Sequence, residues 1–440
     1  MIKNVWNWVL KLFNIQSETQ NKEIELNDEY AENYKRIDEI NFTAIFSNKL
    51  ANYTVNDSTV DIEGNNKRAE FLKDTMTPIW KKIKKPVDMA FGLGAIALVP
   101  YVKNGKIYYK IVEQNRITIN EMDGELITGA TILSERKDIT YLSRTDSYLR
   151  WTDYKVENGN LRIKQEYTDE KGKKIVKPDF WGNVIDEQII HNVDRVLFGF
   201  IKCPRNNRNT SDKFGVPITY GAEATIKELK DTLKQINREF ELKQAFIGAD
   251  RKMFKDGKLP SGGLYKMFSA EARDGTPFWE IFDPAIRESS YFARLEELYS
   301  RLEKEVGTSD GILTKKESNN ATATEIKASR YDTFTIVDDM RSNIENGIYD
   351  FLKACDVLAN ANNLSPMGDW ELNFDWDYSL IESSEDAFNQ LVIGLDKGVV
   401  KKGELRRFIK PTETIEESEK AIAQIEEKQP DIKTLLGTEE

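Results

Sequence analysis

The stretch 217–247 limits the possible folds of this chain more than any other. Its apolar residues recur at alternating steps of four and three, the spacing of a coiled-coil seam: Ala222, Ile226, Leu229, Leu233, Ile236 and Phe240. Most positions off this seam are charged or carry an amide. A globular core needs a wider apolar face than this. We therefore predict a helix over 217–247 that packs on one or two helices and is otherwise covered by water or by more protein.

The charge of the chain argues against a simple nucleic-acid coat. The 440 residues are enough for roughly two or three domains, and the formal net charge is −11. A coat protein would carry a basic surface. A protein past which DNA slides without sticking remains compatible with this charge.

Catalytic signatures are missing from the sequence. His191 is the one histidine, and its setting, IIHNVDRVLFGF, predicts the edge of a buried strand. A metalloprotease helix, a phosphate loop, a CxxC pair and a GxSxG elbow are all absent. Gly92 and Gly94 lack the third glycine of a dinucleotide loop, so close helix packing before a strand explains them better. We expect no enzymatic activity, no cofactor and no metal, and we interpret Cys203 and Cys355 as reduced structural thiols.

Nothing in the sequence predicts a membrane span. No apolar run reaches the length that a spanning helix needs. The N-terminal stretch MIKNVWNWVLKLFNI is apolar on one side and lacks a small-residue cleavage site. We interpret it as a docking helix. A membrane-surface helix is the weaker alternative, because Lys3 and Lys11 alone make a poor basic face.

The order of hydrophobic patterns along the chain indicates an α+β fold. Period-two alternation over 95–200, with polar turns, predicts one antiparallel meander. A strand at 369–378 is expected to join the same sheet. Helical spacing over 323–360 predicts a long helix in which Gly347, unfavourable by about 1 kcal/mol relative to alanine, indicates tight packing.

Three segments in this order carry a resemblance to a known family. They are GVPITYGAEATIKELKDTL at the start of the seam helix, ATATEI at 321–326 after a polar loop, and SSEDAFNQLVIGLDKGVVKKGELRRFI near the end. Together with the order of elements over about residues 30–425, they resemble the portal proteins of long-tailed bacteriophages of Gram-positive bacteria.

The resemblance implies an architecture with an α/β wing, a two-helix stem, a small β-rich clip, a long wing helix and a helical crown. The implied segments are an N-terminal helical segment (1–60), wing (61–216), first stem helix (217–247), clip (248–288), second stem helix (289–306), tunnel loop (307–322), long wing helix and returning strand (323–383), crown (384–427) and a disordered tail (428–440).

The resemblance also implies a function. Portal subunits form a ring, usually of twelve copies, at one vertex of the virion capsid, and the ring is assembled in the bacterial cytoplasm. It is the conduit for packaging and ejecting double-stranded viral DNA, without sequence preference. The implied partners are the terminase large subunit, which supplies ATP hydrolysis, a head-completion or adaptor protein, the scaffold and the major capsid protein.

Charged side chains of the predicted first stem helix are candidates for contacts between subunits. Lys227, Lys230, Lys234 and Arg238 fall on one side of the helix, and Glu228 and Glu239 on another. Opposite charges on different sides suit pairing between neighbours in a closed ring, where each contact repeats. Two alternatives stay open: a solvated charged surface, or a basic stripe that faces DNA in the channel.

The predicted tunnel loop offers contacts to DNA. Its candidates are Lys315, Lys316, Ser318, Asn319 and Asn320. The lysines can contact phosphate and the others can form neutral hydrogen bonds, and the loop has no aromatic residue to stack on bases. An ordinary exposed linker is the alternative.

Two other classes of protein remain as rivals. One is a different phage structural component, such as an adaptor or baseplate protein without a DNA channel. The other is an enzyme, for example a hydrolase with carboxylates brought together from distant parts of the chain.

Overall fold

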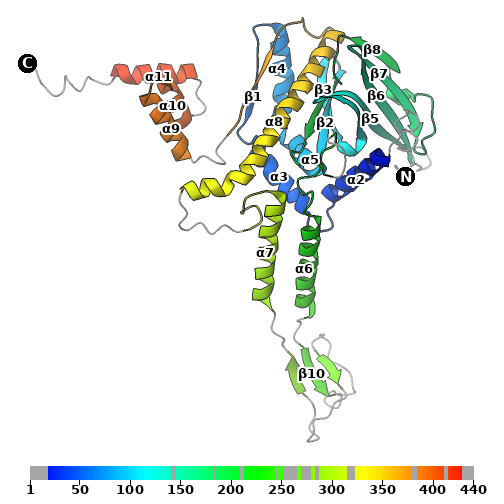
Figure 1. The fold of residues 1–440 in the computed structure, drawn as a ribbon, viewed down its shortest axis with the longest axis vertical. Helices are drawn as coiled ribbons and strands as arrows, with labels where there is room; N and C mark the ends of the chain where they lie inside the picture. The colour runs from blue at the N-terminus through cyan, green and yellow to red at the C-terminus, as the bar shows by residue number, and fades with distance from the viewer. Residues whose placement is uncertain are drawn as a thin grey trace, which may run out of the picture.

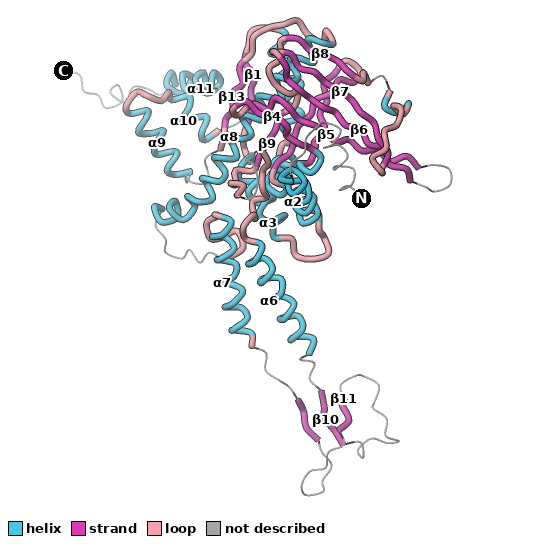
Figure 2. Tube along the Cα trace, turned by 45° about the vertical axis from the view of Figure 1, so that its right-hand side comes forward, coloured by secondary structure: helices cyan, strands magenta, loops and turns pink. Residues whose placement is uncertain are grey.

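A body of sheets and helices, a projecting helix pair and a lateral group of helices make up the structure (Figures 1 and 2). The computed structural model describes residues 18–139, 145–182, 184–208, 213–242, 246–250, 265–268, 279–282, 287–314, 323–377, 384–410 and 415–428. Helices combine with mainly antiparallel strands, so the fold class is α+β.

The first part of the body is helical. It contains α2 (Glu18–Lys35), α3 (Phe42–Val55), α4 (Lys67–Trp80) and α5 (Lys84–Leu93). Side-chain caps fix where α3 and α4 begin. Asn41 accepts a hydrogen bond from the Ala44 amide, and Asn66 accepts hydrogen bonds from the amides of Arg68 and Ala69. As predicted from the sequence, the glycine at 92 serves close packing, since an added Cβ would lie 2.1 Å from the Tyr34 ring of α2.

The strands of 95–202 form two sheets, so the prediction of one meander was wrong. One sheet has the order β3-β2-β9, with β2 (Ala95–Lys103), β3 (Lys106–Glu113) and β9 (Gly199–Lys202). The other has the order β4-β5-β6-β7-β8, with β4 (Ile117–Asp123), β5 (Leu126–Ile139), β6 (Thr145–Glu157), β7 (Asn160–Asp169) and β8 (Glu187–His191). The 3₁₀ turn η1 (Gln114–Arg116) separates the two sheets. The buried Gln114 side chain donates to the Gly215 carbonyl and accepts from the Gly215 amide. These bonds hold the turn in place, and β3 and β4 on either side of it do not pair as a hairpin.

A shared apolar cluster explains why the two sheets stay together. It takes residues from both sheets and from the loop before β9, among them Ala97, Val112, Ile132, Ile163 and Phe198. Sheets with one apolar face each gain most by burying those faces against one another.

The strand predicted at 369–378 forms, but it does not join those sheets. β13 (Glu371–Asp375) pairs antiparallel with β1 (Thr59–Glu63), which lies at the end of the segment expected to be helical. Buried Arg68 provides the reason, because its guanidinium bonds to the carbonyls of Asp356, Ser365 and Pro366. This holds the end of the preceding helix against α4, and the chain therefore leaves beside β1.

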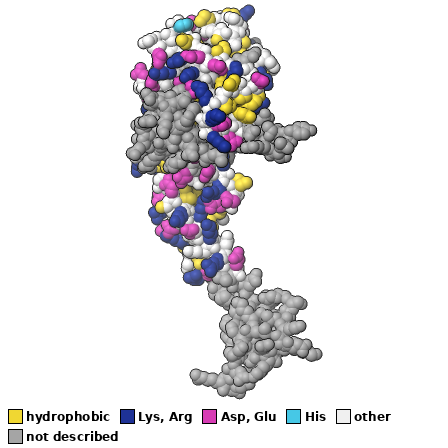
Figure 3. All heavy atoms as spheres, turned by 90° about the vertical axis from the view of Figure 1, so that its right-hand side faces the viewer, with side chains coloured by type: hydrophobic (Ala, Val, Ile, Leu, Met, Phe, Trp, Pro, Cys, Tyr) yellow, Lys and Arg dark blue, Asp and Glu magenta, His cyan; other side chains and the backbone are white. Residues whose placement is uncertain are grey.

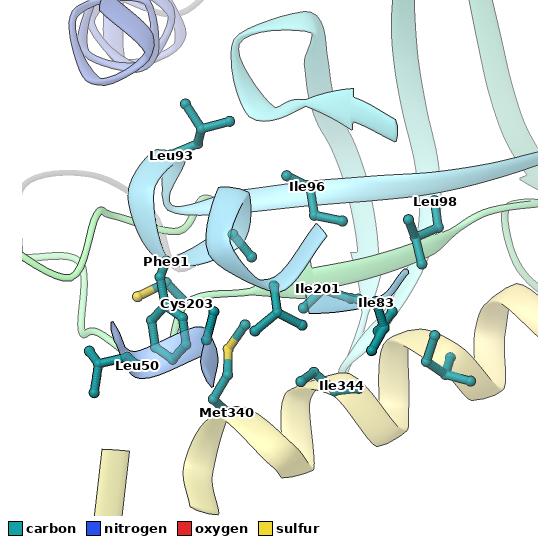
Figure 4. Close-up of a cluster of buried hydrophobic side chains, with 14 of the residues drawn as sticks. Leu50, Ile83, Phe91, Leu93, Ile96, Leu98, Ile201, Cys203, Met340 and Ile344 are labelled. Carbon is teal, nitrogen blue, oxygen red and sulfur yellow. The ribbon is translucent and has the colours of Figure 1, made fainter. Parts of the chain in front are cut away.

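The long helix α8 (Ala323–Ala361) confirms the prediction for 323–360. It crosses the β3-β2-β9 sheet, and Gly347 lies at the crossing, where a Cβ would come within 2.8 Å of the Phe200 carbonyl oxygen of β9. Figure 4 shows Met340 and Ile344 of α8 pointing toward Ile201, within the main buried cluster. The predicted tight packing is thus correct.

The projecting pair consists of α6 (Glu223–Leu242) and α7 (Glu288–Val306). The prediction of 289–306 is confirmed, whereas 217–247 was too long at both ends. Residues 217–222 form turns, with Gly221 at φ 89°, and Phe246–Asp250 is strand β10. With β11 (Tyr265–Phe268) and β12 (Trp279–Phe282), β10 forms a three-stranded sheet of order β11-β10-β12 beyond the pair (Figure 1).

The lateral group contains α9 (Ser384–Asp396), α10 (Lys402–Ile409) and α11 (Ile415–Lys428). The Phe388 and Phe408 rings, 6.1 Å apart, join α9 to α10. The predicted N-terminal docking helix, within 1–17, lies outside the described residues. Of the tail predicted at 428–440, Lys428 ends α11 and 429–440 lie outside the described residues.

Candidate functional site

The projecting helix pair is held together along one apolar strip that loosens away from the body. Near the body, Leu229 of α6 and Leu298 and Leu302 of α7 are fully buried. At the far end, Phe240 is 49% exposed and Phe292 is 63% exposed. The chain alone therefore covers only the upper part of the seam that the sequence predicted.

Ion pairs connect the two helices at two levels. Glu228 of α6 pairs with Arg294 of α7 and lies 3.8 Å from Arg301, and Glu239 pairs with Arg287 at 3.0 Å. Solvent-exposed pairs of this kind contribute little stability each. Their main effect is to set the register of α6 against α7.

Glu239 makes this connection sensitive to acid. Hydrogen bonds from Arg287, and then from Tyr291, lower the pKa of Glu239 to about 2 from an ordinary value of 4.5. Since the folded pKa is depressed, the contribution of Glu239 is complete above about pH 4.5 and is lost as the pH falls toward 2. We expect Glu239→Gln to lose less stability than the wild type between pH 5 and pH 2.5, measured by thermal unfolding. Glu241→Gln, at an exposed position of α6, is the matched control, and an unchanged pH response in Glu239→Gln would contradict the assignment.

Arg205 clamps the body end of the pair. Its guanidinium donates to the carbonyl oxygens of Glu305 and Val306 at the end of α7, and to that of Tyr220 just before α6. Gly307, at φ 85°, closes α7 in the left-handed conformation that favours glycine. The two helices therefore leave the body from one fixed junction.

A buried carboxylate holds the loop that follows α7. Glu303 is fully buried, and its Oε1 accepts hydrogen bonds from the amides of Gly311 and Thr314, both at 3.2 Å, and from that of Leu313. Its Oε2 accepts from the Thr314 hydroxyl at 2.8 Å. These residues belong to the predicted tunnel loop, 307–322, so Glu303 holds the described part of that loop in place.

A groove of about 810 Å³ runs between α6 and the α2–α3 region. Lys227, Lys230 and Lys234 line it from α6. Glu39 crosses it, with Lys230 Nζ at 2.7 Å and Arg36 at 2.8 Å from its carboxylate. The hydrogen bonds from Lys230 and Arg36 lower the pKa of Glu39 to about 2.

The structure divides the six predicted stem charges into two groups. Lys230, Glu228 and Glu239 have partners within the chain. Lys227, Lys234 and Arg238 are exposed and form no ion pair with any described residue. Figure 3 shows one face of the helix pair covered by intermixed basic and acidic side chains. The predicted loop residues Lys315, Lys316, Ser318, Asn319 and Asn320 lie outside the described residues.

The structural positions of Arg205, Glu303 and Glu39 could not be read from the sequence. Each is an ordinary charged residue in a polar stretch, and each acts on partners far along the chain or in a loop without periodicity. A charged residue one turn before the glycine that ends a helix, as Glu303 before Gly307, was the available signal, but it is too common to use alone.

Potential metal ligands are not clustered in the described parts of the chain. Within them, no three His, Cys, Asp or Glu side chains lie together as metal ligands. His191 ends edge strand β8, as the sequence predicted, but it is exposed rather than buried, and its Nδ1 lies 2.9 Å from Asn160 Oδ1. In the same described ranges, no helix has the length and apolar content to cross a membrane.

Comparisons with known proteins leave the family open. No protein-family model matches the chain, and no curated protein matches it.

Proposed function

We propose that the chain is a subunit of a bacteriophage portal ring, the conduit for packaging and ejecting double-stranded viral DNA. The observation that carries the proposal is the projecting α6–α7 pair, with a small sheet at its far end and, in the described residues, one buried strip and exposed Phe240 and Phe292. In this proposal α6 and α7 are the stem, β10–β12 belong to the clip, and the body is the wing with α8 as its long helix. The lateral helices α9–α11 are the crown.

The physical support is that the pair is incomplete in a single chain. Two antiparallel helices with Phe240 and Phe292 exposed at their far end need further apolar cover. A neighbouring subunit provides this cover in a ring, where the same heterologous contact repeats until the ring closes.

Charge complementarity supports the same arrangement. Within the described residues, Lys227, Lys234 and Arg238 on the basic side of α6 form no ion pair, and neither do the exposed Glu288 and Glu296 of α7. We propose that the basic side of α6 faces these α7 acids of the next subunit. Lys227 and Lys234 both line the groove between α6 and the α2–α3 region.

The proposed role in DNA transport is passive. A net charge of −11 limits sticking of DNA to the conduit, and the sequence has no nucleotide-binding phosphate loop. Motion then depends on a terminase as the motor, docked on the clip. Double-stranded DNA, a head-completion or adaptor protein, scaffold and major capsid protein are the other proposed partners at a capsid vertex.

The native mass of the purified protein tests the proposal. We expect a closed ring of about twelve chains of 50.7 kDa each, measured by native mass spectrometry, with a central channel in negative-stain images. A stable monomer would contradict the proposal. A ring without a channel would favour an adaptor or baseplate component.

A charge-swap experiment tests the subunit contact. Lys227→Glu with Lys234→Glu should weaken the ring, and adding Glu288→Lys with Glu296→Lys should restore it, because the swap re-creates opposite charges across the contact. If the first variant keeps its ring but alters DNA packaging, the basic side of α6 faces the channel and the pairing hypothesis is wrong.

A further inference from the structure

Four lysines are concentrated at the junction between α4 and α5, away from the helix pair. They are Lys81, Lys82, Lys84 and Lys85, and all four are exposed. The junction is a tight turn, in which the Lys82 amide donates to the Ile79 carbonyl and the Ile83 amide donates to the Trp80 carbonyl. Ile83 points into the main core (Figure 4). Anchoring of Ile83 therefore directs the lysines on both sides of it outward.

Three of these lysines converge on one hollow. Lys82, Lys84 and Lys85 line a recess of about 550 Å³, and Asn48 of α3 and Tyr109 of β3 also contribute to its lining. Among the described residues of that lining, Asp88 is the only carboxylate. It already accepts a hydrogen bond from the Ser47 hydroxyl at 2.6 Å and is bonded to the Tyr34 hydroxyl. Positive charge is therefore in excess in this recess.

The side chains of these lysines are not neutralised by any contact within the described ranges. None of the four forms an ion pair or a side-chain hydrogen bond with any described residue. Lys84 and Lys85 also occupy the first turn of α5, which contains no acid and where the helix dipole disfavours positive charge. Both features raise the free energy of the unliganded protein, and an anionic ligand would relieve both.

We propose that this cluster, Lys81–Lys85 with its recess, binds the phosphodiester backbone of duplex DNA, apart from the proposed channel. Protein interfaces are depleted in lysine and rely on aromatic and arginine anchors, whereas the described lining of the recess has three lysines, no arginine and one half-buried aromatic residue, Tyr109. Lysines contact phosphates as mobile point charges without reading bases, and asparagine and tyrosine side chains donate to phosphate oxygens. The choice of duplex DNA among phosphate polymers rests on the proposed function, while the anion site itself does not.

Salt-dependent binding of the full-length protein to a 30-base-pair duplex tests the proposal. The triple variant Lys82→Ala, Lys84→Ala, Lys85→Ala should bind more weakly. The slope of log affinity against log salt should become less steep by about three units, close to one for each lost phosphate contact. The double variant Lys82→Ala, Lys85→Ala should lose about two units, and thermal unfolding checks that both variants stay folded.

A matched variant separates a site from a general charge effect. Lys103→Ala, Lys106→Ala, Lys171→Ala removes the same charge from exposed lysines of the β2–β3 turn and the segment after β7, and it should leave the slope unchanged. Equal slopes for the two triple variants would overturn the proposal. The proposal would also be overturned if the Lys82, Lys84 and Lys85 triple variant lost binding to a polyglutamate peptide but bound DNA as the wild type does, since the partner would then be an acidic protein. Failure to form a ring would reject the proposed function and leave this slope difference intact.

Discussion

Gly199→Ala is expected to destabilise the protein by about 3 kcal/mol or more, the upper end of the usual cost of overpacking. A Cβ at Gly199 of β9 would lie 2.0 Å from the Gly347 carbonyl oxygen of α8 and 2.8 Å from the Phe351 Cβ. Neither atom is the tip of a flexible side chain, so relief requires α8 to move away from the sheet. Because α8 contributes Met340, Ile344, Ile348 and Phe351 to the main core, such a movement also loosens that core. Urea unfolding, monitored by circular dichroism, measures the loss.

A neighbouring position of the same helix provides the control. Asn346 precedes Gly347 but is exposed, and Asn346→Ala should change the free energy of unfolding by less than about 0.5 kcal/mol. Gly347→Ala should resemble Gly199→Ala, since its Cβ would lie 2.6 Å from Ile201 Cγ1 and 2.8 Å from the Phe200 carbonyl oxygen. If the urea concentration at the midpoint of unfolding is the same for Gly199→Ala and the wild type, α8 and β9 do not lie as close together as the structure shows.

Helices whose buried apolar residues recur at a regular spacing could be predicted from the sequence. The α7 and α8 helices have their apolar residues at helical spacing, and their observed bounds differ from the predicted ones by one residue. Gly347 was also predictable as a packing position, because glycine inside a helix is unfavourable without such a reason. Local periodicity reports which face is buried, and here that was enough to place long helices.

Partners distant in the chain could not be predicted by the same means. β13 alternates as an ordinary strand, but its pairing with β1 depends on Arg68 holding the end of α8. The division of 95–202 into two sheets depends on Gln114 and on the return of β9 to β2. In the candidate site, the basic side of α6 was visible as a pattern, yet only the structure shows that Lys230 is already paired with Glu39.

Glu303→Met is expected to open the loop after α7, residues 307–314, which is the described part of the predicted tunnel loop. Methionine keeps a side chain of similar length but accepts none of the hydrogen bonds from Gly311, Leu313 and Thr314. Bonds to a buried charged acceptor are worth about 1.5–3 kcal/mol each and are not additive. We therefore expect the free energy of local opening to fall by about 3 kcal/mol. Amide exchange at residues 311, 313 and 314 should then be roughly 100-fold faster.

Two further variants show whether the carboxylate itself holds this loop. Glu303→Gln keeps one oxygen that can accept the three amides and should show an intermediate effect, because it loses the charge and the acceptor for the Thr314 hydroxyl but not the acceptor for the amides. Lys304→Met changes the next residue, which is exposed, and should leave exchange in the loop unchanged. If Glu303→Met leaves the three amides as protected as in the wild type, the loop is held by other contacts, such as the reciprocal hydrogen bonds between Ser309 and Thr333 of α8. If exchange rises as expected and the protein forms the proposed ring, the same variant should lower the length of DNA packaged, because the loop that meets DNA no longer starts from a fixed position.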